Sequence, residues 1–299
     1  MAKIGRGMLG IREKVCYALS KRLIRPPAST HESVQSVREW RDEQLGGQWG
    51  FFSEDRIRGK DVLDFGCGFG TLSFYLLRYA PKRIAGVELD DWLLARANER
   101  WATLPPEDQA RLEFRQGRAE GVPFPEQSFD TVVAFDVMEH VMQPETIVAE
   151  WYRLLRPGGK VLAWWSPFRG PYGPHMESLV PIPWAHLVFG ERAMFRTAER
   201  IYDDPDYVPR PWDHYEDGSR RPNKWKAWSS FKQQGYVNEL RVPDLRRIAE
   251  RVGFAVTRLE PHTFRGSPLR HIVGSALMRM PVVNEYMTSF VILELTRPS

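Results

Sequence analysis

A carboxylate and a glycine-rich turn stand together at residues 62–70, which read VLDFGCGFG. The apolar residues around Asp64 predict a short buried strand of a parallel sheet, and the apolar spacing of residues 71–79 predicts a helix. The turn between them allows positive φ and close backbone approach. A ligand can therefore be bound at the N-terminus of this helix, next to the carboxylate. The glycines of the turn are Gly66, Gly68 and Gly70.

A second acid ends the next apolar stretch, residues 83–89, which read RIAGVEL. At the end of a second strand, Glu88 can accept hydrogen bonds from both hydroxyls of a ribose. The glycine spacing in the turn is G-x-G-x-G, whereas dinucleotide-binding folds use G-x-G-x-x-G. The two acids and the turn therefore predict a ribose-bearing cofactor, with a nicotinamide oxidoreductase as the main alternative.

A third polar group, Asp136, Glu139 and His140, follows the apolar stretch 131–135. A histidine or a carboxylate here could take a proton from an acceptor hydroxyl. His175 lies in a loop shaped by glycine and proline after the fifth expected strand, and it is a second candidate base. The alternative is structural: Asp136 would cap the start of a helix and Glu139 would make a packing contact.

These side chains need a layered scaffold to bring them together. Apolar strands alternate with amphipathic helices along the chain, which predicts an α/β fold with a doubly wound, mostly parallel sheet. A proline–glycine turn at residues 156–160 is expected to end the preceding helix and to precede the fifth strand. The further expected helices are 91–101, 144–155 and 242–252, and the further strands are 111–116, 161–165, 254–259 and 289–296.

The order of the motifs carries more information than any one of them. The glycine turn and Glu88 are followed by Ser128-Phe129-Asp130, then by Glu139-His140, and then by Pro157-Gly158-Gly159. In this order they resemble the class I S-adenosylmethionine-dependent methyltransferases. The resemblance implies a seven-stranded Rossmann-like sheet with an antiparallel last strand, and S-adenosylmethionine as the methyl donor.

The resemblance also implies the roles of individual residues. Ubiquinone-pathway O-methyltransferases use an acid, a Glu and a His at the positions of Asp136, Glu139 and His140 to hold a divalent metal. A metal is not expected here, because many metal-free relatives carry the same Glu-His pair. The implied catalytic residues are His140, His175 and Asp136. The implied cofactor-binding residues are Asp64, Gly66, Cys67, Gly68, Gly70, Glu88, Leu89, Arg118, Ala119, Glu120 and Phe135.

One of these positions departs from the family pattern. Relatives commonly have Asp where this chain has Arg118, and that Asp contacts the adenine amino group. A contact to adenine must therefore come from Glu120 or from a backbone amide.

The 299 residues, 42% of them apolar, are enough for one large domain with an insertion or for two smaller domains. We expect an N-terminal basic amphipathic helical extension at residues 1–50 and a cofactor-binding core at 51–165. A lid over the substrate is expected at 166–240, and the rest of the core sheet at 241–299. The lid is rich in aromatic and histidine side chains, which suits an organic substrate, although most of them are expected to form the core of the lid itself.

Residues 1–30 carry a local charge of +6, whereas the whole chain carries +4. Apolar residues recur there every three or four positions, so a helix with an apolar stripe flanked by bases is expected. Such a helix could bind an anionic membrane surface or pack on the body of the protein. Nucleic acid is not an expected partner, because no basic run interleaved with aromatics occurs beyond residue 30.

The expected localisation is cytoplasmic, with peripheral contact at the inner face of the membrane as an alternative. No run of about 18 apolar residues occurs, and Cys16 and Cys67 are not expected to form a disulfide. The function favoured by the sequence is O-methylation of a bulky small molecule. The alternatives are methylation of RNA or protein, and a non-catalytic S-adenosylmethionine-binding protein.

Overall fold

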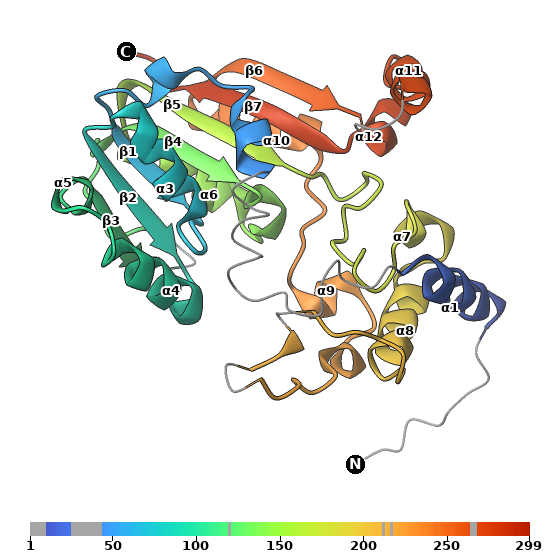
Figure 1. Cartoon of the computed structure of the whole chain (residues 1–299). Helices are drawn as coiled ribbons and strands as arrows, with labels where there is room; N and C mark the ends of the chain where they lie inside the picture. The colour runs from blue at the N-terminus through green and yellow to red at the C-terminus, as the bar shows by residue number, and fades with distance from the viewer. Residues whose placement is uncertain (1–9, 25–43, 119–120, 211–212, 216–217, 264–267) are drawn as a thin grey trace.

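The computed structural model describes residues 10–24, 44–118, 121–210, 213–215, 218–263 and 268–299. Its centre is a seven-stranded sheet in the order β3-β2-β1-β4-β5-β7-β6 (Figure 1). Strand β7 is antiparallel to both of its neighbours, and the other pairs are parallel. The predicted fold class is therefore confirmed. The strands are β1 Asp61–Phe65, β2 Arg83–Glu88, β3 Leu112–Gln116, β4 Phe129–Phe135, β5 Leu155–Trp165, β6 Ala255–His262 and β7 Phe290–Thr296.

Helices cover both faces of the sheet because the central strands are apolar on both sides. In β4, Val132 belongs to the core shared with Trp151 of α6, whereas the next residue, Val133, belongs to the core shared with Trp49. This alternation is the two-residue period of a strand. One face carries α6 (Pro144–Leu154) and α10 (Val242–Val252), and the other carries residues 44–49, α3 (Thr71–Leu76), α4 (Asp91–Trp101) and α5 (Pro106–Gln109).

The predicted turn at residues 156–160 is wrong. Helix α6 does end before it, but Leu155 already pairs with Phe129 and begins β5. The pairing with β4 is irregular between Phe129 and Thr131, and Gly158 takes a φ of 79° inside the strand. Residues 156–159 have no partner in β4, so the proline–glycine segment forms a bulge inside β5 instead of a turn before it.

The last two strands pair antiparallel to each other, but they do not form a simple hairpin. Two helices, α11 (Pro268–Leu277) and α12 (Val283–Met287), lie in the chain between β6 and β7. Strand β7 then enters the sheet between β5 and β6. The edge strand of the sheet is therefore β6, and α11 and α12 project beyond its end (Figure 1).

The segment between β5 and α10 forms a separate body beside the sheet (Figure 1). It contains α7 (Ala185–Val188), α8 (Glu191–Tyr202) and α9 (Phe231–Gln234), which share an apolar core. Helix α1 (Ile11–Leu23) packs on α8 and contributes Cys16 to this core. Most of the aromatic side chains predicted in the lid pack in it, while Trp212 lies outside the described residues. Across the described residues, each helix is too short or too polar to cross a bilayer.

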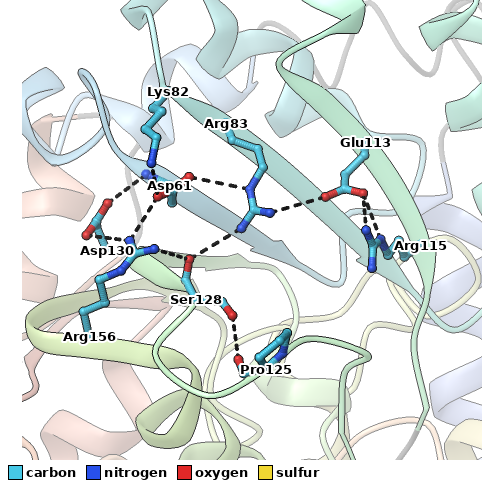
Figure 2. Close-up of polar contacts among 9 residues, drawn as sticks. All are labelled: Asp61, Lys82, Arg83, Glu113, Arg115, Pro125, Ser128, Asp130 and Arg156. Atoms are coloured by element: carbon cyan, nitrogen blue, oxygen red, sulfur yellow. Dashed lines mark hydrogen bonds and ion pairs between the residues drawn. The ribbon is translucent and has the colours of Figure 1, made fainter.

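Ion pairs join the strands at the end of the sheet opposite the glycine turn (Figure 2). Arg156 Nη1 donates to Asp61 Oδ2 at 3.1 Å and to Asp130 Oδ1 at 2.9 Å. Asp130 Oδ2 also accepts from the backbone N of Asp61 at 2.9 Å. Burial opposes ionisation of Asp61, but Lys82 and Arg156 outweigh burial and lower its pKa. The Ser128-Phe129-Asp130 motif thus has a structural use, which is to tie β1, β4 and β5 together.

Candidate functional site

The glycine turn joins β1 to α3 with a left-handed backbone at its three glycines, whose φ values are 72°, 54° and 72°. An added Cβ would lie 2.7 Å from a methyl group of Val137 at Gly66, and 2.5 Å from the ring of Phe114 at Gly70. At Gly68 an added Cβ would meet no described atom within 4 Å. Packing therefore requires two of the glycines, and the third presents its backbone to open space, where a ligand can approach.

Glu88, the last residue of β2, turns its carboxylate toward this turn. Its Oε2 accepts from the backbone N of Gly68 at 2.9 Å, and its Oε1 accepts from the backbone N of Leu89 at 2.7 Å and of Asp90 at 3.0 Å. A carboxylate has about four acceptor directions, so three amides leave capacity for one further donor. This geometry accommodates one ribose hydroxyl and not the expected two, and the role of Glu88 toward a ribose stays a prediction.

Asp64 lies beneath the turn with only 2% of its surface exposed. Burial raises the pKa of its carboxyl to about 7. The hydrogen bond from Ser73 Oγ, at 2.6 Å, acts in the opposite direction, and the negative charge of Glu88 raises the pKa further. Asp64 therefore supports the turn from below, and a cationic ligand above it would favour the ionised form.

Two other predicted cofactor residues, Cys67 and Phe135, are buried. The ring centroid of Phe135 lies 5.4 Å from that of Phe52 and 6.2 Å from that of Trp49. Burial raises the pKa of the Cys67 thiol, and the nearby carboxylates Asp64 and Glu88 raise it further. Both residues can therefore offer a ligand little more than their backbone atoms.

The predicted adenine side of the site lies where β3 ends and α4 begins. Leu89 and Arg118 are exposed there. The backbone N of Arg118 donates to Gly121 O at 3.0 Å, and the backbone N of Gly121 donates back to Arg118 O at 3.2 Å. Ala119 and Glu120 lie outside the described residues, so their predicted contacts to adenine stay untested.

A second polar group begins where β4 ends. Asp136 adopts a left-handed backbone with a φ of 54°, which aspartate tolerates better than most residues. Its Oδ2 accepts from Gln48 Nε2 at 3.3 Å. Gln48 lies in the helical residues 44–49, more than eighty positions earlier in the chain. Such a long-range partner has no local sequence signal, and the sequence reasoning missed it.

Glu139, His140 and His175 converge where the lid meets the sheet. The carboxylate of Glu139 is 2% exposed, and its Oε1 lies 3.7 Å from His175 Nε2. The rings of His140 and His175 meet edge to face with their centroids 5.2 Å apart. One ligand atom from each of the three residues lies within 4.8 Å of the others. The two predicted histidines are thus brought together, while Asp136 does not belong to this group of three.

The end of the lid holds His140 in place. Its Nδ1 lies 2.8 Å from Tyr236 O, which can only accept, so Nδ1 carries the hydrogen and Nε2 carries the lone pair of the neutral ring. Asn238 Nδ2 donates to Met138 O at 2.6 Å and to Val141 O at 2.8 Å, which fixes the 3₁₀ turn Met138–His140. The sequence reasoning missed Tyr236 and Asn238, since their partners lie about a hundred residues away.

A small pocket lies in the lid beside the His175 loop. Its lining includes Pro174, Met176, Met194 and His186. His186 is 8% exposed, and neither of its ring nitrogens has a hydrogen-bond partner in the described part of the chain. Burial lowers its pKa to about 4, so the ring is neutral near pH 7. The sequence predicted packing or a structural hydrogen bond for His186, and the structure shows packing against Phe168.

Residues 63–163 match the family described as a methyltransferase domain. The match begins in β1 and ends in β5, so it contains the glycine turn, Glu88 and the Glu139-His140 pair. This segment is a class I S-adenosylmethionine-dependent methyltransferase domain. The lid, residues 166–240, lies outside the match.

Relatives of the methyltransferase domain cover only part of the chain. A probable S-adenosylmethionine-dependent methyltransferase of Mycolicibacterium smegmatis is 35% identical over 107 residues, which are 36% of this chain and 38% of that protein. A ubiquinone biosynthesis O-methyltransferase of Pseudomonas fluorescens is 32% identical over 124 residues, 41% of this chain and 47% of that protein. The chain thus spans less than half the length of these relatives.

A solved structure shares the fold over a longer range. The S-adenosylmethionine-dependent methyltransferase from Mesorhizobium loti overlays on 90% of this chain and on all of its own, with a TM-score of 0.50. The two sequences are 17% identical, so this likeness concerns the fold alone.

Replacing Glu88 by alanine is expected to weaken S-adenosylmethionine binding by about 10- to 150-fold, which corresponds to about 1.5–3 kcal/mol for the loss of charged hydrogen bonds. Calorimetric titration measures this change. The matched control is Glu107→Ala, which removes an exposed carboxylate from α5 and should leave the affinity unchanged. Equal affinity of Glu88→Ala and the unaltered protein would remove the ribose role from Glu88.

Proposed function

We propose that the protein transfers the methyl group of S-adenosylmethionine to the oxygen of a bulky, largely apolar small molecule. The observation that carries this proposal is the convergence of Glu139, His140 and His175 between the methyltransferase domain and the lid. The cofactor is expected above the glycine turn. The acceptor is expected under the lid, and the three residues lie on the boundary between the two.

His140 is the residue that we assign to proton transfer. Because Tyr236 O fixes the hydrogen on Nδ1, Nε2 keeps a lone pair that can accept the proton of an acceptor hydroxyl. When S-adenosylmethionine is bound, it supplies an electrophilic methyl carbon: the acceptor oxygen forms the new bond to that carbon, and the sulfur keeps the electron pair of the broken bond. The acceptor proton remains on His140 and passes to water after the product leaves.

His175 and Glu139 support this step as positioning residues. The buried Glu139 carboxylate faces His175 Nε2 at 3.7 Å, which orients the imidazole. The His175 ring in turn packs edge to face with His140 at a centroid distance of 5.2 Å. Most of the rate acceleration should still come from holding the acceptor in line with the methyl group, because orientation outweighs acid–base help in a displacement of this kind.

The lid pocket has room for about one water molecule, with a volume of about 10 Å³, so a bulky acceptor would need the lid to open. Met176 and Met194 give the pocket an apolar lining that can adapt in shape. The neutral ring of His186 adds one donor and one acceptor that lack partners in the described part of the chain. If the pocket widened, an acceptor with an apolar body could contact the methionines and place a hydroxyl or a carbonyl group against His186, while Glu177 also lines the pocket. The pocket shares a loop with His175, because Pro174 and Met176 are among its lining residues.

A metal-assisted reaction is the second candidate, and it uses the same three residues. Two imidazoles and a carboxylate suit several divalent metals. Ligand atoms around a tetrahedral ion are about 3.4 Å apart, and those of Glu139, His140 and His175 lie within 4.8 Å of one another. Small side-chain movements would therefore bring them to binding distance. This set replaces Asp136, which the family resemblance implied, by His175.

The test is methyl transfer from labelled S-adenosylmethionine to a panel of hydroxylated aromatic and isoprenoid-bearing compounds, after calorimetric titration with S-adenosylmethionine and, separately, NADH. We expect S-adenosylmethionine alone to bind and a phenol or alcohol to be methylated at oxygen. Chelator-treated protein should keep its activity if His140 is the base. Activity that is lost on chelation and restored by a divalent metal would reassign the three residues as metal ligands.

Other outcomes of this test would overturn the proposal. Binding of S-adenosylmethionine without turnover on small molecules or extracts would favour a non-catalytic binding protein. Nucleic acid that copurifies and stays bound at high salt would favour an RNA methyltransferase. Binding of neither cofactor would withdraw the enzymatic function altogether.

A further inference from the structure

Helices α1, α7 and α12 lie on the right of the view in Figure 1, and each of them, or the residue directly before it, carries an exposed apolar side chain. Ile11 of α1 is 80% exposed, Val188 of α7 is 58% exposed, and Val282, at the start of α12, is 70% exposed. Clusters of this kind mark interaction sites on protein surfaces. We call this cluster the docking face, and it consists of Ile11, Val15, Leu19, Leu23, Val188 and Val282.

Polar contacts connect the three segments. Trp184 Nε1, directly before α7, donates to Tyr286 O in α12 at 2.7 Å. Glu13 Oε1 in α1 pairs with Arg192 Nε at 3.4 Å, and Arg192 lies in the first turn of α8, which follows α7. Helix α1 is therefore joined to α8, α8 also packs on α7, and the residue before α7 is joined to α12, so the three segments are linked through α8 and Trp184.

The packing of α1 on α8 does not explain why the apolar side chains of α1 are exposed. Cys16 and Ser20 are its fully buried residues, and they lie on the side that packs against α8. The four apolar residues of α1 in the docking face follow one another at intervals of four, so they form a stripe along the helix. A helix that served only to pack on α8 would turn such a stripe inward.

The charge around the docking face is positive. The acids within α1, α7, α11 and α12 are Glu13, which pairs with Arg192, and Glu285. Glu285 is buried and pairs with Arg169 at 2.9 Å and with Arg241 at 2.7 Å. Exposed bases on the same segments and on the link between α11 and α12 are Arg12, Lys14, Arg22 and Arg279. Lys21 is also exposed, but it pairs with Asp204 at 2.7 Å and with Asp206 at 3.4 Å, just after α8.

We propose that the docking face binds the surface of an anionic phospholipid bilayer. Apolar side chains would enter the boundary between headgroups and acyl chains, while the bases would contact anionic headgroups. A second copy of this chain fits less well, because a two-fold interface would bring the bases of one copy against the same bases of the other. The charge pattern therefore favours a membrane over a dimer.

Docking would also bring the lid pocket to the bilayer. His186 and Ala185 line the pocket from α7, and the next two residues of α7 are exposed. An apolar acceptor dissolved in the membrane could then enter the lid without crossing water. This last point rests on the proposed function, whereas the docking itself does not.

The experiment is cosedimentation of the full chain with vesicles of phosphatidylcholine, alone or mixed with phosphatidylglycerol, in the absence of cofactor and acceptor. We expect binding to the mixed vesicles that weakens at high salt. Leu19→Glu and Val188→Glu should each lower the partition coefficient about tenfold or more, and Arg12→Glu about fivefold or more. The matched control is Ala110→Glu, which adds the same charge to an exposed position after α5, on the opposite side of the molecule (Figure 1).

The proposal would be overturned if the unaltered protein ignored anionic vesicles, or if the glutamate variants bound them as well as it does. A dimer in solution that Leu19→Glu dissociates would assign the face to a second copy instead. Because vesicle binding is measured without methyl transfer, its failure leaves the proposed function intact. The variants should also methylate a water-soluble acceptor at the unaltered rate, which separates lost docking from lost folding.

Discussion

Replacing His140 by alanine is expected to lower kcat about 10²- to 10⁴-fold, the usual contribution of a general base. The affinity for S-adenosylmethionine should change little, since Glu88 and the glycine turn lie outside the group that contains His140. Single-turnover kinetics together with calorimetry separate these two effects. A variant that loses cofactor binding as strongly as turnover would place His140 in the cofactor site instead.

A second variant separates proton transfer from a structural role. His140→Gln can still donate a hydrogen bond to Tyr236 O, but its amide cannot accept a proton near pH 7. We expect it to be as slow as His140→Ala. The loss should shrink for acceptors whose hydroxyl is already ionised at the assay pH, because they need no base. Recovery of the full rate by glutamine would show that His140 acts only through the position it gives to the lid.

Replacing Asp64 by asparagine should stabilise the protein at pH 8. The pKa of Asp64 is about 7 in the folded state and about 4 in an unfolded chain, so the folded state holds the extra proton between these values. Stability therefore falls as the pH rises from about 4 to 7, and the lost free energy of unfolding is up to about 4 kcal/mol. An asparagine side chain cannot ionise, so the Asp64→Asn variant should not show this loss in chemical denaturation across that range.

The matched control is Asp61→Asn, three residues earlier on the same strand. Lys82 and Arg156 outweigh burial and lower the pKa of Asp61, so its ionised form stabilises the fold above the unfolded pKa and loses that effect as the pH falls. The variant should therefore be less stable than the unaltered protein near neutral pH. If Asp64→Asn were destabilised at pH 8 in the same way, the buried Asp64 would have to be ionised at no cost, contrary to our interpretation.

Several helices could be predicted because the apolar spacing of their residues and their tertiary contacts favour the same secondary structure. The helix expected at 91–101 is α4, and the helix expected at 242–252 is α10, with the same bounds. The segment 156–160, expected as a turn before the fifth strand, is a bulge inside β5 because Leu155 before it already pairs with Phe129. The helices between β6 and β7 were not anticipated either. Their exposed apolar residues have no periodic core face that the sequence alone would reveal.

The candidate site was predictable only where its residues lie inside a motif. Glu139 and His140 belong to the motif that follows β4. His175 was a candidate because it lies in a loop shaped by glycine and proline. That Glu139 faces His175, and that Tyr236 fixes the hydrogen of His140, depends on contacts between residues 36 to 96 positions apart. Contacts at such separations arise from the whole fold and leave no local trace in a single sequence.

The packing of α1 on α8 also has a consequence for synthesis. Helix α1 ends at Leu23 and α8 begins at Glu191, so at roughly 5–20 residues per second a ribosome needs about 10–30 s to make the chain between them. During that interval the side of α1 that carries Cys16 lacks α8, the helix on which it packs in the described structure. A chaperone or a bilayer surface can therefore reach that side of α1 before the rest of the lid exists.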